Sequence, residues 1–428
     1  MKPQEDFLHF IWQLQYFNTP HLATEQGEVI TIIDNGSLNA NAGPDFSEVR
    51  LKIGQITWAG HVEMHVNASD WYKHKHQKDA AYDNVILHVV WENDQQVFEK
   101  EGKPIPTLVL KEKVPIGLLN RYQNLQASQE QIACSTQLKA VNRLTVLSML
   151  DVALTSRLEK KASYISQKLQ QNKGDWEATT YQVLCRNLGF KVNADAFEQL
   201  AQQLPLKILQ KHLDQSMQVE ALIFGTAGFL NEDFHDEYLL KLKREFQFLE
   251  KKYQLKPLHK SQWKFLRMRP ANFPTVRLAQ LAATIHQQRG FFTAILEENS
   301  FEHFYSLFNV PPSAYWQTHY MPAKETARKI KGLGKQSIDN LLINTVAPLL
   351  MAVGIRQQSE HFKQRAVGLL EQIKPESNRY TKIWEAEGIK LQSAFDTQAG
   401  LELYQTFCAH KKCLSCKIGV ETLRKTPA

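Results

Sequence analysis

The feature that most constrains this chain is a change in hydrophobic period partway along it. Residues 28 to 110 contain short β-rich runs separated by Asn, Gly, Asp and Pro, a pattern typical of strands: EVITII, SEVRLKI, QITWAGHVEMHV, NVILHVVWE and TLVL. Beyond residue 117, stretches such as LTVLSMLDVALTSRLEKKASYISQKL repeat apolar residues at helical spacing. We therefore predict an α+β protein, with a mixed α/β sheet domain over residues 1–115 and an all-helical region over 116–428.

A single helix is predicted ahead of the strands, because residues 5 to 17 place apolar side chains at helical spacing. The chain has 428 residues, more than one ordinary core accommodates, and 43% are hydrophobic, as in folded globular proteins. Its 51 basic and 44 acidic residues give a net charge of +7. This mild excess permits attraction to nucleic acid phosphates without requiring it.

We expect a cytoplasmic protein with no membrane partner. The first residues, MKPQEDFLHFIWQLQYF, place acids ahead of the apolar side chains and lack a small-residue cleavage site, unlike a secretory signal. No uninterrupted apolar run approaches the length of a membrane span. In such a protein, five cysteines are expected to be thiols or metal ligands rather than a disulfide framework.

A β-hairpin is predicted over residues 47 to 66. Gly54 and Gln55 form its two-residue loop, and glycine at the first loop position suits a type II′ turn. The loop pairs residues whose numbers sum to 109, which makes one face apolar as far as Met64. A polar surface and a functional site are both consistent with the other face, since any half-exposed hairpin alternates in this way. That face carries Glu48, Arg50, Lys52, His61, Glu63 and His65.

The residues after the hairpin favour a site. The next strand, NVILHVVWE, is apolar on both faces, as expected for a covered central strand, and it contains His88. The intervening loop, SDWYKHKHQKDAAYDN, adds His74 and His76 close to two aspartates. This loop is therefore rich in metal ligands and proton carriers. For His88, a simple hydrogen-bonded core histidine is the alternative.

The N-terminal sequence resembles the PD-(D/E)xK nuclease superfamily in two motifs and in the order of its predicted elements. Pro44-Asp45 matches the superfamily's Pro-Asp on the second strand, and Glu63-Met64-His65 matches its (D/E)xK on the third, 18 residues after Asp45. The resemblance implies a core of helix, strand, hairpin, helix and strand. It also implies that Asp45 and Glu63 hold Mg²⁺ or Mn²⁺, which polarises a phosphate and activates water.

This sequence departs from that pattern at His65, which stands where the superfamily has lysine and would act as a base or a third ligand. The sum-109 register also pairs Asp45 with Met64 on the apolar face, so a bulge or irregular turn at Gly43-Pro44 is required to redirect Asp45. Glu48, opposite His61, is the substitute acid. The histidine-rich loop resembles that of very-short-patch repair endonucleases, superfamily relatives that use histidines near the metal.

The C-terminal FCAHKKCLSCKIG has a C-x4-C-x2-C spacing, and close spacing lets thiolates converge on one ion or cluster. We expect a structural zinc ion or [4Fe–4S] cluster, with free thiols in a helical tail as the alternative. Cys134 is the preferred fourth ligand and His410 the second choice. One distant cysteine with three clustered ones resembles the iron–sulfur staple of certain recombination nucleases, although the order of spacings differs. The clustered cysteines are Cys408, Cys413 and Cys416.

Two helical-region segments are candidates for contact with nucleic acid. ARKIKGLGKQSIDNLLINTV, residues 327 to 346, looks like a helix-hairpin-helix, in which Gly332, Gly334 and Lys335 would bind a phosphate. A glycine-rich link between two structural helices fits equally well. RMRPANFPTVRLAQLAA, residues 267 to 283, is a basic turn before a helix, which either faces a ligand or ties a loop to neighbouring helices. Its arginines are Arg267, Arg269 and Arg277.

Over nearly its full length the chain resembles an uncharacterised bacterial family known only as a domain of unknown function. The segments that carry this resemblance include GPDFSEVRL, GHVEMHVNASDWYKHKHQKDAAYDNVILHVVWE, RMRPANFPTVRLAQLAA, LLINTVAPLL and CLSCKIG. ALIFGTAGFL belongs to the same set, and its small residues predict close helix packing rather than a phosphate loop. The family implies one architecture and no activity.

The leading hypothesis is a metal-dependent nuclease acting on DNA or RNA, with DNA favoured. Asp45 and Glu63 would be its cation ligands and His65 its base or third ligand, while the helical region would position the nucleic acid. The alternatives are a non-catalytic nucleic-acid-binding or scaffold protein that retains a nuclease-like sheet, and a metalloenzyme of another class. In the latter, zinc or iron would be bound by His61, Glu63, His65 and the histidine-rich loop.

Overall fold

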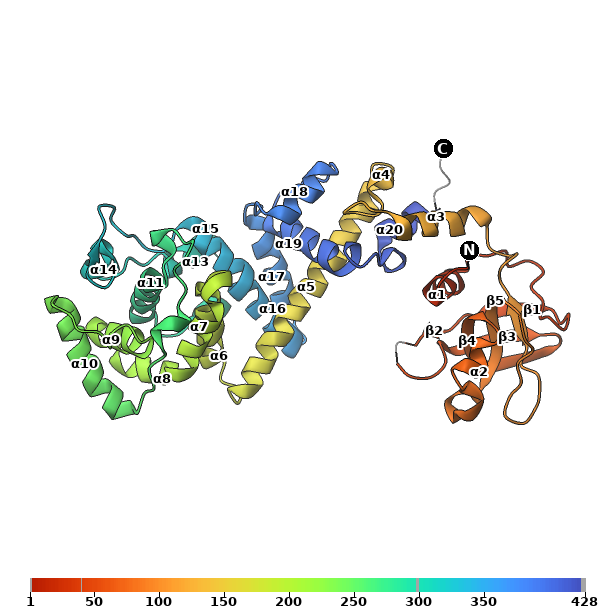
Figure 1. The fold of residues 1–428 in the computed structure, drawn as a ribbon, viewed down its shortest axis with the longest axis horizontal. Coiled ribbons are helices and arrows are strands. Elements are labelled where there is room, and N and C mark those ends of the chain that lie inside the picture. Colours follow the sequence, from red (N-terminus) through yellow and green to blue (C-terminus); the bar gives the residue numbers. More distant parts are fainter. Residues whose placement is uncertain (1, 40, 298–299, 425–428) are drawn as a thin grey trace. The chain divides into compact units, whose positions relative to one another are not determined.

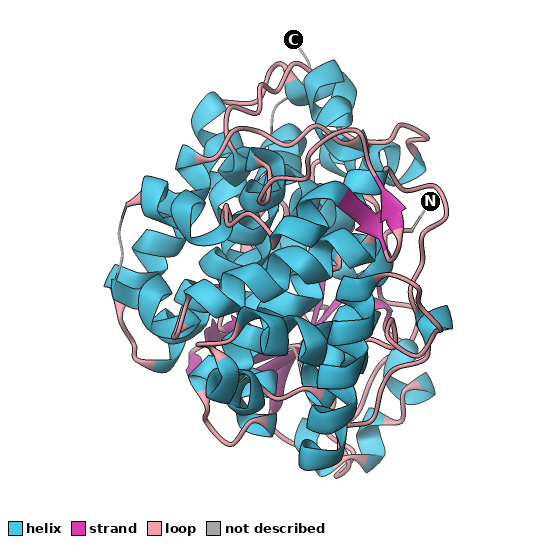
Figure 2. Ribbon diagram, turned by 90° about the vertical axis from the view of Figure 1, so that its left-hand side faces the viewer, coloured by secondary structure: helices cyan, strands magenta, loops and turns pink. Residues whose placement is uncertain are grey.

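The computed structural model describes residues 2–39, 41–297 and 300–424, and the α+β prediction is confirmed. The chain divides into two compact units, one made of residues 1–149 and 403–428 and the other of residues 150–402. Figure 1 labels the elements along the chain, and Figure 2 separates strands from helices by colour. The division predicted at residue 115 marks the end of the strand-rich part. The first compact unit also takes in the helices that follow and the C-terminal segment.

The first unit is built on a six-stranded mixed sheet with the order β1-β3-β4-β5-β6, and β2 pairs with β3 beside β1. The β1–β3 and β3–β4 pairs are antiparallel, whereas β4–β5 and β5–β6 are parallel. All five predicted strand segments form. Their bounds are β1 (Ile30–Asp34), β2 (Ser37–Leu38), β3 (Phe46–Ile53), β4 (Ile56–Asn67), β5 (Val85–Glu92) and β6 (Thr107–Val109).

Both faces of this sheet are covered at its central strands β4 and β5. α1 (Glu5–Gln13) packs on β4, and its Phe7 ring meets Trp91 of β5 edge-on with centroids 6.4 Å apart. On the opposite face, α2 (Asp70–Lys73) places Trp71 in a cluster with Val90 and against the His88 ring. Glu63 lies beside His88 in the β4–β5 register, so both face the α2 side. The end of the hairpin's polar face that carries Glu63 and His65 is therefore interior, whereas Glu48, Arg50 and Lys52 are exposed.

A β-bulge changes the register of the hairpin next to Asp45. The sum-109 pairing holds from Ile53↔Ile56 to Val49↔Gly60, and Gly54 has φ 59, as a type II′ turn requires. Beyond Val49 the pairing shifts to Phe46↔Val62, and Glu48 takes φ 58. The predicted pairing of Glu48 with His61 is therefore wrong, as is a break confined to Gly43-Pro44. One extra residue in β3 moves Asp45 opposite Glu63.

The other elements of the first unit are helices. α3 (Ile116–Ala127) and α4 (Ser135–Leu138) follow the sheet, and α5 (Arg143–Gln171) begins in this unit and continues into the second. At the C-terminal end, a π-helical segment (Leu403–Cys408) and a short 3₁₀ turn (Cys413–Ser415) precede α20 (Lys417–Arg424). The first unit thus contains segments from both ends of the chain.

The second unit is helical apart from one two-stranded hairpin among its described residues. A buried polar network binds α5 to α19, in which Arg157 donates to Gln398 and pairs with Glu402. The elements are α6 (Trp176–Leu188), α7 (Phe190–Gln203), α8 (Leu206–Leu209), α9 (Ser216–Thr226), α10 (Glu237–Tyr253), α11 (Pro274–Gln287), α12 (Phe291–Glu297), α13 (Phe301–Phe308), α14 (Ala314–Thr318), β7 (His319–Met321), β8 (Lys324–Glu325), α15 (Lys335–Leu341), α16 (Ala347–Arg356), α17 (Glu360–Gln372), α18 (Arg379–Ala386) and α19 (Ala394–Glu402).

α15, a π-helical turn (Leu342–Val346) and α16 form one helix from Lys335 to Arg356. By length and composition alone it is the one described helix able to span a membrane, but 78% of its most apolar window is buried inside the protein. Such burial is typical of a core helix.

The predicted helix-hairpin-helix at residues 327 to 346 is wrong, because no helix forms between Thr326 and Gly334 in this described segment. The chain runs there as a loop and enters α15 at Lys335. Packing explains why residue 332 is a glycine, because a Cβ there would lie 2.5 Å from Asn309 Oδ1. The buried loop residue Leu333 anchors this segment to the core in place of the expected first helix.

Close helix packing at ALIFGTAGFL is confirmed by Gly225 of α9. A Cβ built on Gly225 would lie 2.1 Å from the Phe246 ring of α10. We expect Gly225→Ala to lower the free energy of unfolding by about 1–3 kcal/mol, because the ring must move within a packed interior. Urea denaturation of the full chain measures this change.

The matched control is Gly368→Ala in α17, where a Cβ would meet no atom within 4 Å. Alanine in place of a helical glycine should stabilise by up to about 1 kcal/mol. Equal midpoints for the two variants would contradict tight α9–α10 packing.

Candidate metal centre

Asp45 and strand β4 are joined by two hydrogen bonds, one donated by each side. The backbone N–H of Asp45 donates to Glu63 Oε2 at 3.0 Å, and the N–H of Met64 donates to Asp45 Oδ2 at 2.9 Å. The bulge makes this exchange possible, because it brings Asp45 opposite Glu63. Glu63 is thereby held at one oxygen, and its other oxygen is left to face the interior.

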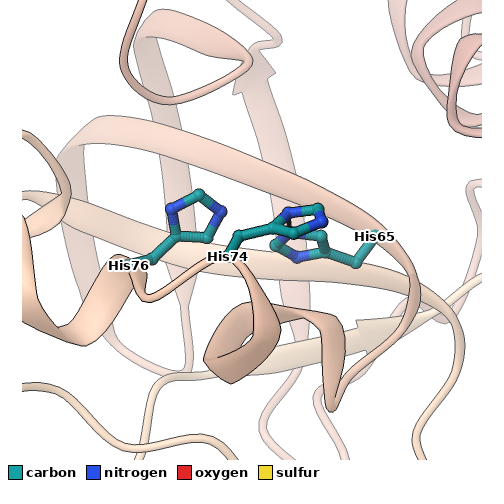
Figure 3. Close-up of side chains that lie close together, drawn as sticks. All are labelled: His65, His74 and His76. Carbon is teal, nitrogen blue, oxygen red and sulfur yellow. Dashed lines mark hydrogen bonds between the residues drawn. The ribbon is translucent and has the colours of Figure 1, made fainter.

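That second oxygen, Glu63 Oε1, lies among histidine nitrogens. It is 3.2 Å from His76 Nε2 and 3.5 Å from His65 Nε2. His65 Nε2 in turn lies 3.1 Å from His74 Nδ1. Figure 3 shows the three rings gathered over β4, with His74 and His76 coming from the loop that follows it. Between these two, Lys75 takes a left-handed φ of 63, so the chain turns and both rings approach His65.

His88 supports this group from behind. Its Nε2 lies 2.8 Å from His65 Nδ1, and its side chain is completely buried. One of these two nitrogens is protonated and donates a hydrogen bond to the other. This hydrogen bond fixes the orientation of the His65 ring. His88 is thus a buried, hydrogen-bonded histidine, as the alternative prediction had it. Its hydrogen bond orients His65, which belongs to the cluster.

Burial sets the charge state of the two inner histidines. Loss of hydration lowers the pKa of His65 to about 2, and the neighbouring histidines act in the same direction. Desolvation likewise lowers the pKa of His88 to about 3. Both rings are therefore neutral at physiological pH. Desolvation and the nearby Asp45 charge raise the pKa of Glu63, although contact with His76 opposes this shift.

His9 of α1 is a further member of the site. Its Nε2 lies 3.2 Å from Asp45 Oδ2. Burial lowers the pKa of His9, but its contacts with Asp45 and the nearby Asp6 and Glu5 outweigh burial, and the net shift is upward. No sequence pattern pointed to His9, because it lies in a helix that is otherwise read from its apolar residues. Only its packing against β3 brings it to Asp45.

The donor set fits a transition metal ion. A tetrahedral site with metal–nitrogen bonds of about 2.0–2.1 Å separates its donors by about 3.3 Å. The separations in the structure are 3.1, 3.2 and 3.5 Å. Ligand atoms of His65, His74 and His76 all lie within 4.8 Å of one another. His76 Nε2 is buried and, among the described residues, has no aligned hydrogen-bond partner. Imidazole nitrogen suits zinc or iron better than magnesium or manganese, which prefer oxygen ligands.

Two predicted site residues are not in this cluster. Glu48 is exposed at the bulge. His61 is half-buried, and its Nδ1 has no hydrogen-bond partner among the described residues. Its β4 position pairs with Val85, where the β4–β5 register is interrupted.

The predicted nucleic-acid contacts divide into exposed and buried residues. Arg267, Arg269 and Lys335 are exposed. Arg277 is 4% exposed and donates to Gln280, Asn272 and Ser337, so the structural alternative holds for this arginine. A Cβ on Gly334 would meet nothing within 4 Å.

A cavity of about 280 Å³ opens beside the histidines, lined by Trp71, His76 and Tyr82. Tyr82 stacks on the His76 ring at 3.9 Å. The rim carries four charged residues, three of them acidic: Asp83, Glu99, Lys100 and Glu101. A small ligand could therefore reach His76 from this side.

Residues 5–379 match the family model described as "Protein of unknown function (DUF2851)". The chain belongs to this family. The match covers the sheet and most of the helical unit, and it ends before the C-terminal cysteines. No curated protein and no solved structure matches the chain. Membership of DUF2851 thus confirms the family resemblance and supplies no activity.

We expect the protein to retain zinc or iron at this centre, and His76→Ala to abolish retention because it removes one of the three grouped histidine donors and the one nearest Glu63 Oε1. His88→Ala, which removes only the support behind His65, should weaken metal affinity by about 10- to 100-fold. Metal analysis after dialysis, with titration of the metal-free protein, measures both effects. His61→Ala is the matched control, and equal metal release from all three variants would contradict the centre.

In the chelator-treated protein, the free energy of unfolding should fall as the pH is lowered from about 6.5 towards 3. The unfolded chain protonates His65 and His88 near their ordinary pKa of 6.5, whereas in the folded state their pKa values are about 2 and about 3. Each contributes a slope of at most about 1.4 kcal/mol per pH unit. The raised pKa of Glu63 partly offsets them.

Denaturant titrations at several pH values measure this dependence. His88→Gln should make the slope shallower, and substitution of the exposed His21 by Asn should not. An unchanged slope in His88→Gln would contradict a neutral buried imidazole.

Proposed function

We propose that this protein is a metal-dependent nuclease that hydrolyses phosphodiester bonds in DNA or RNA. The observation that carries the proposal is the grouping of ligand atoms of His65, His74 and His76 within 4.8 Å of one another, with Glu63 Oε1 beside His65 and His76 and Asp45 hydrogen-bonded to Glu63. Zinc or iron, rather than magnesium, suits this set of donors.

The arrangement of the first unit supports the phosphodiesterase class. A helix, a strand, an antiparallel hairpin, a short helix and a parallel strand follow one another, as the PD-(D/E)xK resemblance implies. Asp45 stands at the start of the second of these strands and Glu63 on the third. His65 replaces the lysine, and because it is neutral it would serve as a ligand, not as a fixed cation.

Each residue has a distinct task in this proposal. Glu63 and the three histidines would hold the cation, which when bound would polarise the phosphate and supply a nucleophile at neutral pH. The Asp45 backbone fixes the Glu63 carboxylate, and His88 fixes the His65 ring. His9 and Asp45 form a pair that can hold a proton at His9 Nε2 and release it to a leaving oxygen.

The charge distribution supports binding of the nucleic acid by the helical part. Residues 1–115 contain ten Lys and Arg against sixteen Asp and Glu, a net charge of −6, whereas the remaining chain carries +13. Several exposed basic residues come from two segments of the second unit that contact one another, since Gln280 donates to the Lys331 carbonyl and Thr275 to the Tyr320 carbonyl. They are Arg267, Arg269, Arg328, Lys329, Lys331 and Lys335.

A metalloenzyme of another class is the second candidate. It is favoured by the acidic rim of the cavity beside His76, which would repel a polyanion but admit a small neutral or cationic substrate. Cleavage assays with small esters and amides, run beside nucleic acid substrates, separate the two candidates.

The nuclease proposal is tested with Zn²⁺, Fe²⁺ or Mn²⁺ and mixed single- and double-stranded DNA and RNA. Glu63→Gln removes a proposed metal ligand and should reduce the cleavage rate by at least about 100-fold. Loss of a residue that only supports a ligand already costs about 10- to 100-fold. Glu48→Gln, an exposed carboxylate on the same hairpin, should leave the rate unchanged. No cleavage by the wild type, or equal cleavage by Glu63→Gln, would overturn the proposal. Nucleic acid binding without cleavage would favour the scaffold alternative.

Binding by the basic segments is tested separately. Arg267→Ala/Arg269→Ala should weaken DNA binding and reduce the slope of log K against log salt by about 0.9 for each phosphate that the protein no longer neutralises. Lys100→Ala/Lys103→Ala removes two exposed lysines from the acidic first unit and should change neither value. Equal salt slopes for the wild type and the arginine variant would contradict this assignment.

A further inference from the structure

The C-terminal segment of the chain is tied to residues 116–148 within the first unit. Gln126 and Lys411 exchange two hydrogen bonds, since each side chain donates to the other's carbonyl, at 3.1 and 2.6 Å. Arg121 Nε donates to the Leu423 carbonyl at 2.8 Å. The N–H of Asn142 donates to Glu421 Oε1 at 2.9 Å. Segments far apart in sequence therefore form one structure.

Four cysteines meet where these segments join. Cys134 precedes α4, Cys408 is the last residue of the π-helical segment, and Cys413 and Cys416 lie between that segment and α20. Cys134, Cys413 and Cys416 are 8%, 8% and 6% exposed, and none of the five cysteines forms a disulfide. Burial raises the pKa of Cys408, and the thiols of the other three raise it further. The four thiols thus lie near one another, and three of them are almost fully buried.

The backbone around Cys416 is arranged to receive a thiolate. Cys416 comes directly before α20, and the N–H groups of Ile418 and Gly419 donate to its sulfur. Gly419 allows the chain to close over the group, because a Cβ there would lie 2.3 Å from the Cys413 carbonyl oxygen. N–H donors to sulfur are typical of metal–thiolate centres, where they stabilise negative charge.

We propose that Cys134, Cys408, Cys413 and Cys416 bind a [4Fe–4S] cluster that fastens the C-terminal segment to the first unit. His410, the other predicted ligand, is exposed and lies outside the buried group. Deprotonated thiolates in so buried a position require a compensating positive charge, which iron supplies.

The spacing of the sulfurs favours a cluster over a single zinc ion. Zinc–sulfur bonds of about 2.3 Å place four thiolates about 3.8 Å apart. Among the described residues, the cysteines do not form a group of three or more ligand atoms within 4.8 Å of one another, whereas the histidines do. A cluster bound through four separate iron atoms holds its thiolates farther apart than one ion does.

The position of the centre gives it a structural role. The chain leaves the first unit after Met149 and returns to it at Leu403, and the four cysteines lie on both sides of this excursion. A cluster there would link the segment before the helical unit to the segment after it. Its presence does not depend on the hydrolytic activity proposed for the histidine centre.

The test is anaerobic purification of the full chain followed by iron, sulfide and zinc analysis and visible spectroscopy. We expect about four iron and four sulfide per chain, with the broad visible absorption of iron–sulfur clusters. Cys134→Ser should lose most of the iron, while His410→Ala and Cys185→Ala should keep it, because Cys185 is buried in α6 of the other unit. A colourless protein that contains zinc, or Cys134→Ser with unchanged iron, would overturn the proposal.

Alkylation of the wild type provides a second measurement in case Cys134→Ser fails to fold. In the native protein the four proposed ligands should resist alkylation, and removal of iron with a chelator should expose them together. Mass spectrometry identifies the modified cysteines. Release of only the three C-terminal cysteines would overturn the assignment of Cys134.

Discussion

The exchange of hydrogen bonds between Asp45 and β4 is the interaction on which the candidate site depends. Two bonds, Asp45 N to Glu63 and Met64 N to Asp45, exist because β3 contains one more residue than its partner strand at this point. An uninterrupted ladder would place Asp45 opposite Met64, on the apolar face covered by α1. The bulge therefore converts an ordinary hairpin into a scaffold for two adjacent carboxylates.

The second constraint is desolvation. Glu63, His65, His76 and His88 are each no more than 9% exposed. Desolvation lowers the pKa of His65 and of His88, so both rings stay neutral and His65 Nε2 remains available as a ligand. Buried polar groups normally pair with one another, yet His76 Nε2 and His88 Nδ1 have no hydrogen-bond partner among the described residues. A bound cation would compensate the buried Glu63 carboxylate and occupy the lone pair of His76. In the proposed iron–sulfur site, iron would compensate the charge of the four thiolates in the same way.

The basic residues of the helical unit show how similar sequence patterns lead to different structural outcomes. Arg277 and Arg269 lie in one arginine-rich segment, but Arg277 is held inside by three hydrogen bonds and the Phe190 ring, whereas Arg269 is exposed. The helix start at Lys335 was predictable from its pattern. The helix expected before it does not form: Gly332 packs against Asn309 and Leu333 is buried within a loop.

Alternation, turn chemistry and residue spacing are local properties of the sequence. The sequence alone therefore determined the strands, the turn at Gly54, the helical character of the chain after residue 117, and the face that Glu63 and His65 share. Cysteine spacing likewise pointed to the C-terminal group. Tertiary structure alone decided that Glu48 and His61 lie outside the cluster, that His9 belongs to it, and that Asp45 reaches Glu63. The physical reason is that a single extra residue in β3 shifts the strand register. In addition, α1, which is distant in sequence, contributes His9 to the site. Neither effect leaves a trace in the pattern of residues along one segment.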